Sequence, residues 1–364
     1  MNISVLFLYV WIIGTLGFIF WRVLTNPITR IHGAVMNNDI ETVRSCLDKG
    51  VDPDVRKGQG VTPLCIATYD GNREIAELLL DRGAEINQGL EEENGVNPLL
   101  NAARFGDEEF VKILLARGAK IGLHFAALQG DIDVVKEYLE RGSPIQSMRN
   151  RGMTPLHLAA LGNQRETAEL LLEYGADINF ETPASETALH QAVRGQSKEV
   201  IELLADRGAD LNPIGLAGTP LQLAILENDI EIVRLLIAKG ADVNAGNSRV
   251  NFPLHTVART DTEQAEFTFH HVARTEAEQV EMVELLIANG AKVNACPNRS
   301  PRTPLHWAAN RRNLEVARAL IRHGADVNSH NFLSGITPLS EARGNQEMTD
   351  LLIAHGATNY GWVD

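Results

Sequence analysis

Cysteine is scarce in this sequence and forms no motif. The 364 residues include three cysteines, Cys46, Cys65 and Cys296. None of them stands in a C-x-x-C pair, and together they supply no disulfide framework. We therefore expect structural thiols in a reduced interior.

Aromatic residues and basic runs are also lacking. Aromatics make up 5% of the chain and hydrophobic residues 44%, so we expect an interior of Leu, Ala, Ile and Val, which suits closely packed helices. The net charge is −14, and no basic stretch suits a phosphate backbone. Nucleic acid is therefore not an expected partner.

Catalytic signatures are absent as well. The sequence contains no G-x-S-x-G, no phosphate-binding P-loop, no H-E-x-x-H and no kinase motif set. The acidic run Glu91–Glu93 falls in an expected loop, without the apolar surroundings that would shift a carboxyl pKa. We expect no enzyme activity, no catalytic or metal-ligating residue, no cofactor and no small-molecule substrate.

Charge is missing from the beginning of the chain. No charged side chain occurs at residues 2–21, and about 20 apolar residues in a helix span the ~30 Å hydrocarbon core of a bilayer. The stretch lacks the positive start, the short apolar run and the small-residue cleavage site of a signal peptide. Arg22 and Arg30 follow it and no Lys or Arg precedes it, which places the remainder in the cytoplasm.

These features predict a single-pass membrane protein. Residues 1–23 are expected to form an uncleaved transmembrane anchor, and residues 24–30 a short linker. The alternative is a cleaved export signal, which would make the chain a secreted or translocated effector.

A short phrase recurs through the rest of the chain. Its cleanest copies are TPLHLAA at 154–160 and TPLHWAA at 303–309, and the dominant spacing is 33 residues, which indicates a repeat protein. The positions equivalent to its leucine are Ile31, Leu64, Leu99, Leu123, Leu156, Leu189, Leu221, Leu254, Leu305 and Leu339.

Each repeat reads as two short helices. Thr154 can cap the first helix and Pro155 suits its first position. Gly162 and Asn163 end that helix, and Gly175 ends the second, because glycine adopts the left-handed conformation found at helix ends. Such short helices are not stable alone, so neighbouring repeats must stack.

The repeats resemble ankyrin repeats, which have a 33-residue period and a T-P-L-H-x-A signature. Further matches are GADINF at 175–180, GADVNA at 240–245, GAKVNA at 290–295 and GADVNS at 324–329. The resemblance covers residues 31–358, about ten repeats, and leaves 359–364 as a C-terminal tail. It implies an all-α solenoid of helix–turn–helix units with projecting β-hairpin loops, which binds a protein partner through loop tips and the concave face of the first helices.

Two spacings depart from the period. The gap of 24 between Leu99 and Leu123 predicts that a hairpin loop is missing at Lys120–Gly122. The gap of 51 between Leu254 and Leu305 contains a tandem duplication, because HTVARTDTEQAE at 255–266 matches HHVARTEAEQVE at 270–281 in eight of twelve positions. We expect a helical insertion at about 255–281, as a longer helix or as a protruding loop.

Six histidines occupy the TPLH slot. Packed helices lie about 8–10 Å apart, whereas metal ligands must lie near 2 Å from one ion, so these histidines cannot share a metal. We expect each imidazole to hydrogen-bond to loop backbone. The six are His32, His124, His157, His190, His255 and His306.

The partner-binding candidates are the loop tips and the variable positions after the Ala-Ala pair. The loop tips offer Arg56, Lys57, Met148, Arg149, Arg151, Phe180, Arg249, Arg299, Arg302 and Phe332. The positions after the Ala-Ala pair offer Tyr69, Arg104, Phe105, Leu128, Leu161, Arg194, Leu226, Asn310 and Arg311. Because arginine and aromatic residues often dominate interface energy, we expect an arginine-bearing concave face for a protein partner with an acidic segment. The predicted function is a scaffolding module held at a membrane.

Overall fold

The structure is a computed structural model that describes a series of segments of the chain. They are residues 27–57, 61–87, 97–104, 107–148, 152–246, 252–259, 275–296, 302–330 and 335–358. Within these segments, every helix is too short or too polar to cross a bilayer. The predicted anchor at residues 1–23 and the tail at 359–364 lie outside them.

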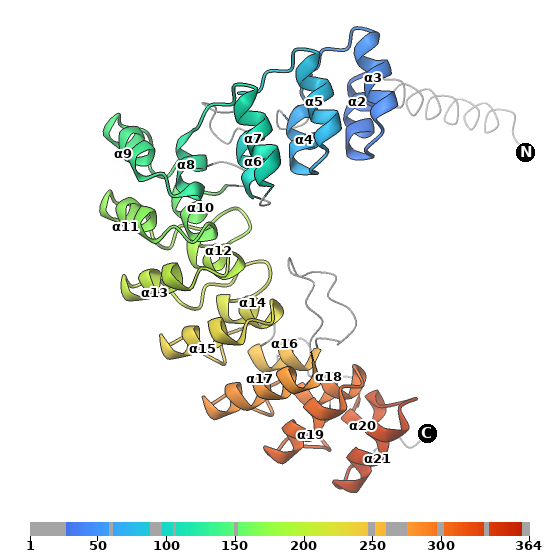
Figure 1. Cartoon of the computed structure of the whole chain (residues 1–364). Coiled ribbons are helices and arrows are strands. Elements are labelled where there is room, and N and C mark those ends of the chain that lie inside the picture. The colour runs from blue at the N-terminus through green and yellow to red at the C-terminus, as the bar shows by residue number, and fades with distance from the viewer. Residues whose placement is uncertain are drawn as a thin grey trace, which may run out of the picture. The chain divides into compact units, whose positions relative to one another are not determined.

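Helices in the described segments follow one another in pairs (Figure 1). The chain forms two compact units, an N-terminal unit, Met1–Pro155, and a C-terminal unit, Leu156–Asp364. The N-terminal unit contains α2 (Pro27–Met36), α3 (Ile40–Asp48), α4 (Pro63–Tyr69), α5 (Arg73–Asp81), α6 (Pro98–Arg104), α7 (Glu108–Ala116), α8 (Leu123–Gln129) and α9 (Ile132–Glu140).

The C-terminal unit continues the same alternation of a short first helix and a longer second helix. It contains α10 (Pro155–Leu161), α11 (Arg165–Glu173), α12 (Ala188–Arg194), α13 (Lys198–Asp206), α14 (Pro220–Leu226), α15 (Ile230–Ala238), α16 (Pro253–Arg259), α17 (Glu276–Ala288), α18 (Pro304–Asn310), α19 (Leu314–Arg322), α20 (Pro338–Glu341) and α21 (Gln346–Ala354). Isolated antiparallel bridges join Lys57 to Val61 and Gly215 to Gly218 in the projecting loops.

Local chemistry explains where the helices begin. The Thr219 hydroxyl accepts a hydrogen bond from the Gln222 N–H at 3.3 Å, and Pro220 occupies the first position of α14. Most second helices begin at an Asp or Asn cap, as where the Asp229 carboxylate accepts from the Ile232 N–H at 3.0 Å. The predicted Thr-Pro helix start is therefore confirmed.

Stacking in each unit buries the small faces of the helices. In the N-terminal unit α2, α4, α6 and α8 contact one another in order, and in the C-terminal unit α12, α14, α16, α18 and α20 do the same. All ten positions equivalent to the phrase leucine are buried, from 0% exposed at Ile31 to 7% at Leu339. The repeating leucine position is therefore the core of each unit.

Asparagine side chains join successive loops. Asn244 Oδ1 accepts from the Lys292 N–H at 2.9 Å, and its Nδ2 donates to the Gly290 carbonyl at 3.0 Å. Asn294 makes the equivalent pair of bonds with Asp326 and Gly324. The asparagine of the GADVN phrase is thus a bridge to the next repeat.

The missing loop is confirmed in the N-terminal unit. Only residues 117–122 connect α7 to α8, whereas residues 141–154 connect α9 to α10. The short connection is held by the Tyr138 hydroxyl, which donates to the Ile121 carbonyl at 3.1 Å, and by Asn87 Oδ1, which accepts from the Lys120 N–H at 2.7 Å.

The duplicated segment is partly helical. Residues 255–259 belong to α16, which has the ordinary length, so the expectation that the insertion begins at 255 is wrong. Helix α17 has 13 residues where the other second helices have 9, and Thr275 caps its start by accepting from the Glu278 N–H at 3.2 Å. Part of the duplication therefore lengthens the second helix by about one turn. Residues 260–274 lie outside the described segments, so the choice between helix and loop stays open there.

Candidate partner-binding surfaces

The six slot histidines brace the loop that precedes the next helix. His32 Nε2 lies 3.1 Å from the Val61 carbonyl, His157 Nε2 3.1 Å from that of Glu186, and His306 Nε2 3.1 Å from that of Ile336. His124, His190 and His255 bond to the carbonyls of Ser147, Gly218 and Arg302 at 2.8, 3.1 and 3.0 Å. The predicted bonds to loop backbone are therefore confirmed at every one of these positions.

The hydrogen bonds also determine which ring nitrogen carries the proton in two of these imidazoles. Nδ1 of His190 and of His306 accepts a backbone N–H, from Thr187 and Thr303 respectively, each at 3.1 Å. Nδ1 is therefore unprotonated and Nε2–H donates to the carbonyl. Burial lowers the pKa of His157 and of His255 to about 4, and it also lowers the pKa of His190 and His306.

The predicted contact residues differ in how far the structure exposes them. Arg56, Tyr69 and Arg311 are exposed, and Arg104, Leu161 and Phe180 are half-buried. Leu128 is a correction: it is 6% exposed and lies in α8, whose Leu123–Leu128 segment is wholly buried, so its side chain adds to the core. The positions outside the described segments are Phe105, Arg149, Arg151, Arg249, Arg299 and Phe332.

The predicted contact residues Phe180 and Arg194 contact other parts of the chain. The Phe180 ring meets the His157 ring edge-on, with centroids 6.3 Å apart, so it helps to brace the loop. The Arg194 guanidinium is ion-paired with Glu186, and both side chains are largely buried, at 14% and 12% exposed. Arg194 is therefore a structural residue, which removes one positive charge from the expected arginine-bearing face.

Arginine does gather at one place in the C-terminal unit, around Trp307 of α18. The Arg302 guanidinium carbon lies 5.1 Å from the Trp307 ring centroid, and that of Arg259 lies 6.0 Å from it. Arg311 follows at the C-cap of α18 and is exposed. We call these four residues, Arg259, Arg302, Trp307 and Arg311, the arginine–tryptophan cluster.

Sequence reasoning missed half of this cluster. Arg259 occupies the position equivalent to Arg194 and Leu161, at the end of a first helix, but the neighbouring duplication obscured the alignment. Trp307 lies one helical turn earlier than Arg311, inside the TPLHWAA phrase itself. The sequence did contain a signal for this residue, because Trp307 replaces the aliphatic residue that TPLHLAA has at the same position, Leu158.

Apolar side chains are exposed at another loop of the C-terminal unit. Leu216 is 71% exposed and Ile214 is 36% exposed, next to the bridge between Gly215 and Gly218. Neither residue was among the predicted tips. Two isolated side chains make only a small apolar patch, since scattered exposed hydrophobic residues are ordinary in soluble domains.

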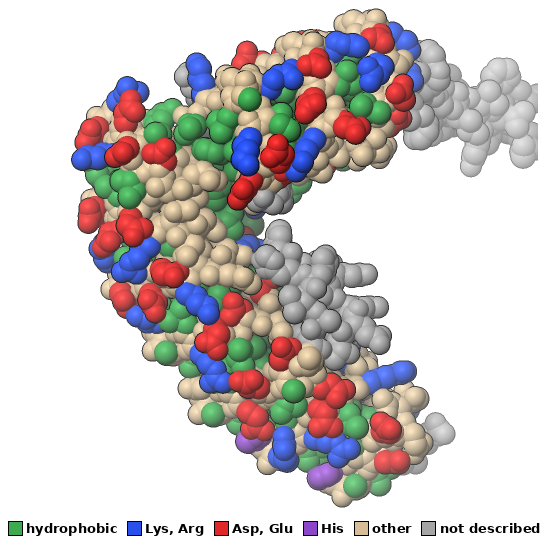
Figure 2. Space-filling view, viewed as in Figure 1, with side chains coloured by type: hydrophobic (Ala, Val, Ile, Leu, Met, Phe, Trp, Pro, Cys, Tyr) green, Lys and Arg blue, Asp and Glu red, His purple; other side chains and the backbone are tan. Residues whose placement is uncertain are grey.

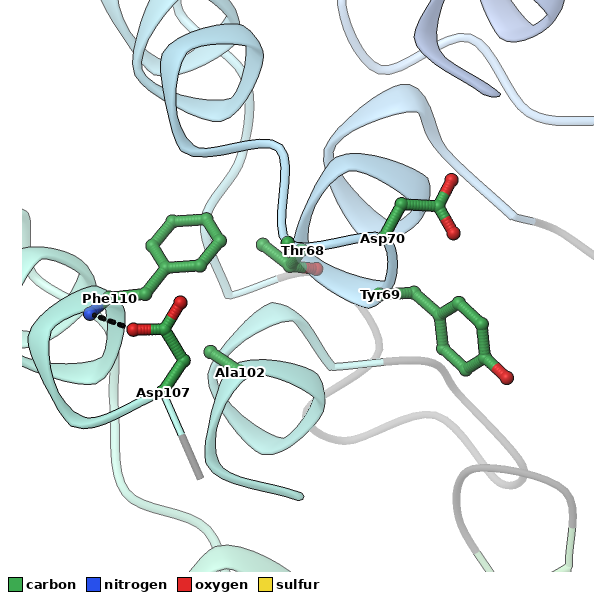
Figure 3. Close-up of a pocket in the computed structure, with 7 residues that line it drawn as sticks. Thr68, Tyr69, Asp70, Ala102, Asp107 and Phe110 are labelled. Carbon is green, nitrogen blue, oxygen red and sulfur yellow. Dashed lines mark hydrogen bonds between the residues drawn. The ribbon is translucent and has the colours of Figure 1, made fainter. Parts of the chain in front are cut away.

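The N-terminal unit has a cavity of about 270 Å³ beside α4, α6 and α7 (Figure 3). Figure 3 shows Tyr69 and Asp70 pointing away from Asp107 and Phe110. The Asp107 carboxylate accepts from the Phe110 N–H at 3.0 Å and from Arg73 Nε at 3.0 Å. Burial raises the pKa of Asp107, but these bonds outweigh it and lower the pKa. Asp107 thus serves to begin α7 and to hold Arg73.

Charged side chains of both signs alternate over the second helices of the C-terminal unit (Figure 2). Several pairs cross from one repeat to the next, such as Lys239–Asp206 at 2.6 Å and Arg234–Glu281 at 2.7 Å. Exposed pairs of this kind contribute about 0–1 kcal/mol each. On the face shown in Figure 2, the described second helices of the C-terminal unit therefore carry no patch of one sign that would select a charged partner.

The cysteines differ in their environment. Cys46 and Cys65 are buried, as expected, but Cys296 is exposed, so the expectation of an interior thiol is wrong at that position. Burial raises the pKa of the Cys65 thiol, which keeps it protonated and unreactive.

Comparisons with known proteins agree with this architecture. A family model described as ankyrin repeats matches residues 31–122, 123–215 and 269–360, and one described as ankyrin repeat matches 218–248. The crystal structure of the human ASB11 ankyrin repeat domain is similar, with a TM-score of 0.51 and 25% identity over 66% of this chain and 99% of that chain.

A curated relative shares a shorter segment. The serine/threonine-protein kinase VIK of Arabidopsis thaliana is 42% identical over 62 residues, which is 16% of this chain and 14% of that protein. The shared part is a small fraction of that protein, so the kinase activity in its name is not carried to this chain.

Proposed function

This chain belongs to the ankyrin-repeat family, and we propose that it is a non-enzymatic module that binds another protein at a membrane. Each helix pair from α2/α3 to α20/α21 is taken as one repeat, which makes ten in the described residues. Stacking buries the leucine and alanine faces of the helices, so the ends of the first helices are the surfaces that we propose for partner binding.

The observation that carries the proposal is the arginine–tryptophan cluster. Its residues come from two successive repeats, those of α16 and α18, which contact each other. Arginine and tryptophan are the residue types that most often dominate an interface. An acidic segment of the partner complements this surface, and Arg56, Tyr69, Arg104 and Leu161 remain proposed contacts on other repeats.

Binding is tested with the full-length chain in detergent. Crosslinking in cells identifies the partner, and the affinity of the purified complex is then compared between the wild-type chain and a double variant, Arg259→Glu with Arg311→Glu. We expect at least about a tenfold loss of affinity, because charged contacts contribute about 1.5–3 kcal/mol each.

The matched control reverses charges at the C-caps of two second helices, Arg82→Glu with Arg117→Glu. These arginines pair with Asp48 and Asp81 at 2.7 and 2.6 Å, away from the first-helix ends. Equal losses in both double variants would contradict the proposed surface, and a chain that forms no protein complex in cells would contradict the proposed function.

Membrane attachment rests on residues 2–21, which carry no charge, and on Arg22 and Arg30 after them. We propose that they anchor the chain with its repeats in the cytoplasm. The full-length protein should resist extraction by alkaline carbonate and keep its first residues in mass spectrometry. Release by carbonate, or loss of about the first 25 residues, would instead support the secreted or translocated effector.

A further inference from the structure

The arginine–tryptophan cluster holds two cations against one ring. Arg302 precedes α18 and Arg259 ends α16, and both guanidinium groups lie within about 6 Å of the Trp307 centroid, the range of cation–π attraction. The ring is half-buried, so it is fixed by the repeat beneath it and still reaches solvent. The cluster is therefore a platform made of a half-buried ring with two guanidinium groups over it.

The positive charges of this platform are only partly balanced. Arg302 is ion-paired with Glu341 at 2.6 Å, and Asn310 Nδ2 holds the same carboxylate at 2.8 Å. Arg259 makes no ion pair with a carboxylate of the described residues. Burial and the neighbouring charge of Arg311 lower the pKa of Arg259.

We propose that Arg259 and Arg311, beside Trp307, anchor one acidic side chain, Asp or Glu, of an extended partner segment. The planar guanidinium of Arg259 can donate two parallel hydrogen bonds to one carboxylate. Trp307 offers apolar surface for the stem of that side chain. This inference rests on the proposed function and names the chemistry that the partner must bring.

Charge selects a single carboxylate over a polyanion. The chain carries a net charge of −14, which repels an extended polyanion such as nucleic acid, and the cluster spans only two repeats. A phosphoserine shares the anionic chemistry, so the test includes it as a separate arm.

The test uses full-length protein labelled with 5-fluorotryptophan. The ¹⁹F signal of Trp307 is assigned with Trp307→Phe, and the probe is a short Gly/Ser peptide with one central Glu. We expect the Trp307 signal to shift and saturate with this peptide but not with the matched peptide that carries Gln. Equal shifts with both peptides would overturn the inference.

Two variants and the third peptide sharpen the outcome. Arg259→Gln keeps a polar side chain without the charge and should weaken binding of the Glu peptide by at least about tenfold. Arg82→Gln, which lies in the N-terminal unit, should leave the titration unchanged. If Arg259→Gln binds the Glu peptide as tightly as the wild type, the proposed role of Arg259 in holding the carboxylate is wrong. If a phosphoserine peptide binds more tightly than the Glu peptide, the choice of a carboxylate is wrong.

The experiments distinguish a failure of the proposed carboxylate site from a failure of the proposed function. If the Arg259→Gln variant forms a cellular protein complex with undiminished affinity, the module still binds a partner and only the proposed role of Arg259 is wrong. If no complex forms with the wild-type chain, the proposed function itself is wrong.

Discussion

At the scale of single residues, Gly195 illustrates how closely successive repeats approach each other. It follows α12 with an ordinary φ of −81°, so its backbone conformation does not require glycine. A Cβ added there would lie 2.0 Å from the Leu161 carbonyl oxygen of the preceding repeat. The absence of a side chain at this position is thus a packing requirement.

Gly195→Ala should therefore destabilise the protein. We expect the free energy of unfolding to fall by about 1–3 kcal/mol or more, because the two repeats must separate to admit one methyl group. The measurement is the midpoint of urea unfolding. The control is Gly33→Ala in helix α2, where a Cβ meets nothing within 4 Å. Gly33→Ala should stabilise the protein by up to about 1 kcal/mol. An unchanged urea midpoint for Gly195→Ala would contradict the close approach of the two repeats.

At the scale of elements, the loops are joined by side-chain clamps such as that of Asn244. Asn244→Ala removes both bonds to the next loop, and we expect a loss of about 1–2 kcal/mol in stability. Deuterium exchange at the Lys292 amide should become faster. Asn244→Asp keeps the acceptor for that amide and should slow its exchange again. Equal exchange in all three proteins would show that the clamp adds nothing.

At the scale of the whole molecule, buried histidines make stability depend on pH. In the unfolded chain a histidine binds a proton near pH 6.5, whereas folded His157 and His255 do so only near pH 4. Between these values the unfolded state binds more protons, so stability is complete above about pH 6.5 and falls as the pH drops toward 4. A pKa lowered from 6.5 to about 4 corresponds to a loss of about 3 kcal/mol in the free energy of unfolding for each histidine once the pH has fallen below 4.

The prediction is a lower melting temperature at pH 4.5 than at pH 7, measured by calorimetry. The double variant His157→Gln with His255→Gln should show a shallower dependence on pH, because glutamine does not titrate. Glutamine suits this slot, since Gln222 occupies it naturally and its Oε1 accepts from the Thr219 N–H at 3.0 Å. An equally steep dependence in the variant would assign the effect to other groups.

Periodic features were predictable because each depends on residues of one repeat and its neighbour. The leucine positions, the Thr-Pro helix start, the missing loop and the bracing histidines were all read from the period, and the described residues confirm them. Features that interrupt the period were predicted less well. The start of the insertion was misplaced, because HTVAR at 255–259 forms an ordinary first helix despite its resemblance to the second copy.

The repeating helix pairs follow from the sequence alone, since capping, helix length and the burial of small residues are set within about 33 residues. The bracing role of the slot histidines follows from it in the same way. Which arginines keep their charge for a partner depends instead on tertiary packing. Glu186 neutralises Arg194, and Glu341, which belongs to a later repeat, pairs with Arg302. Arg259 instead lies near the Trp307 ring and makes no ion pair with a carboxylate of the described residues. Such pairings depend on distances between side chains of different repeats, and the period of the sequence does not encode them.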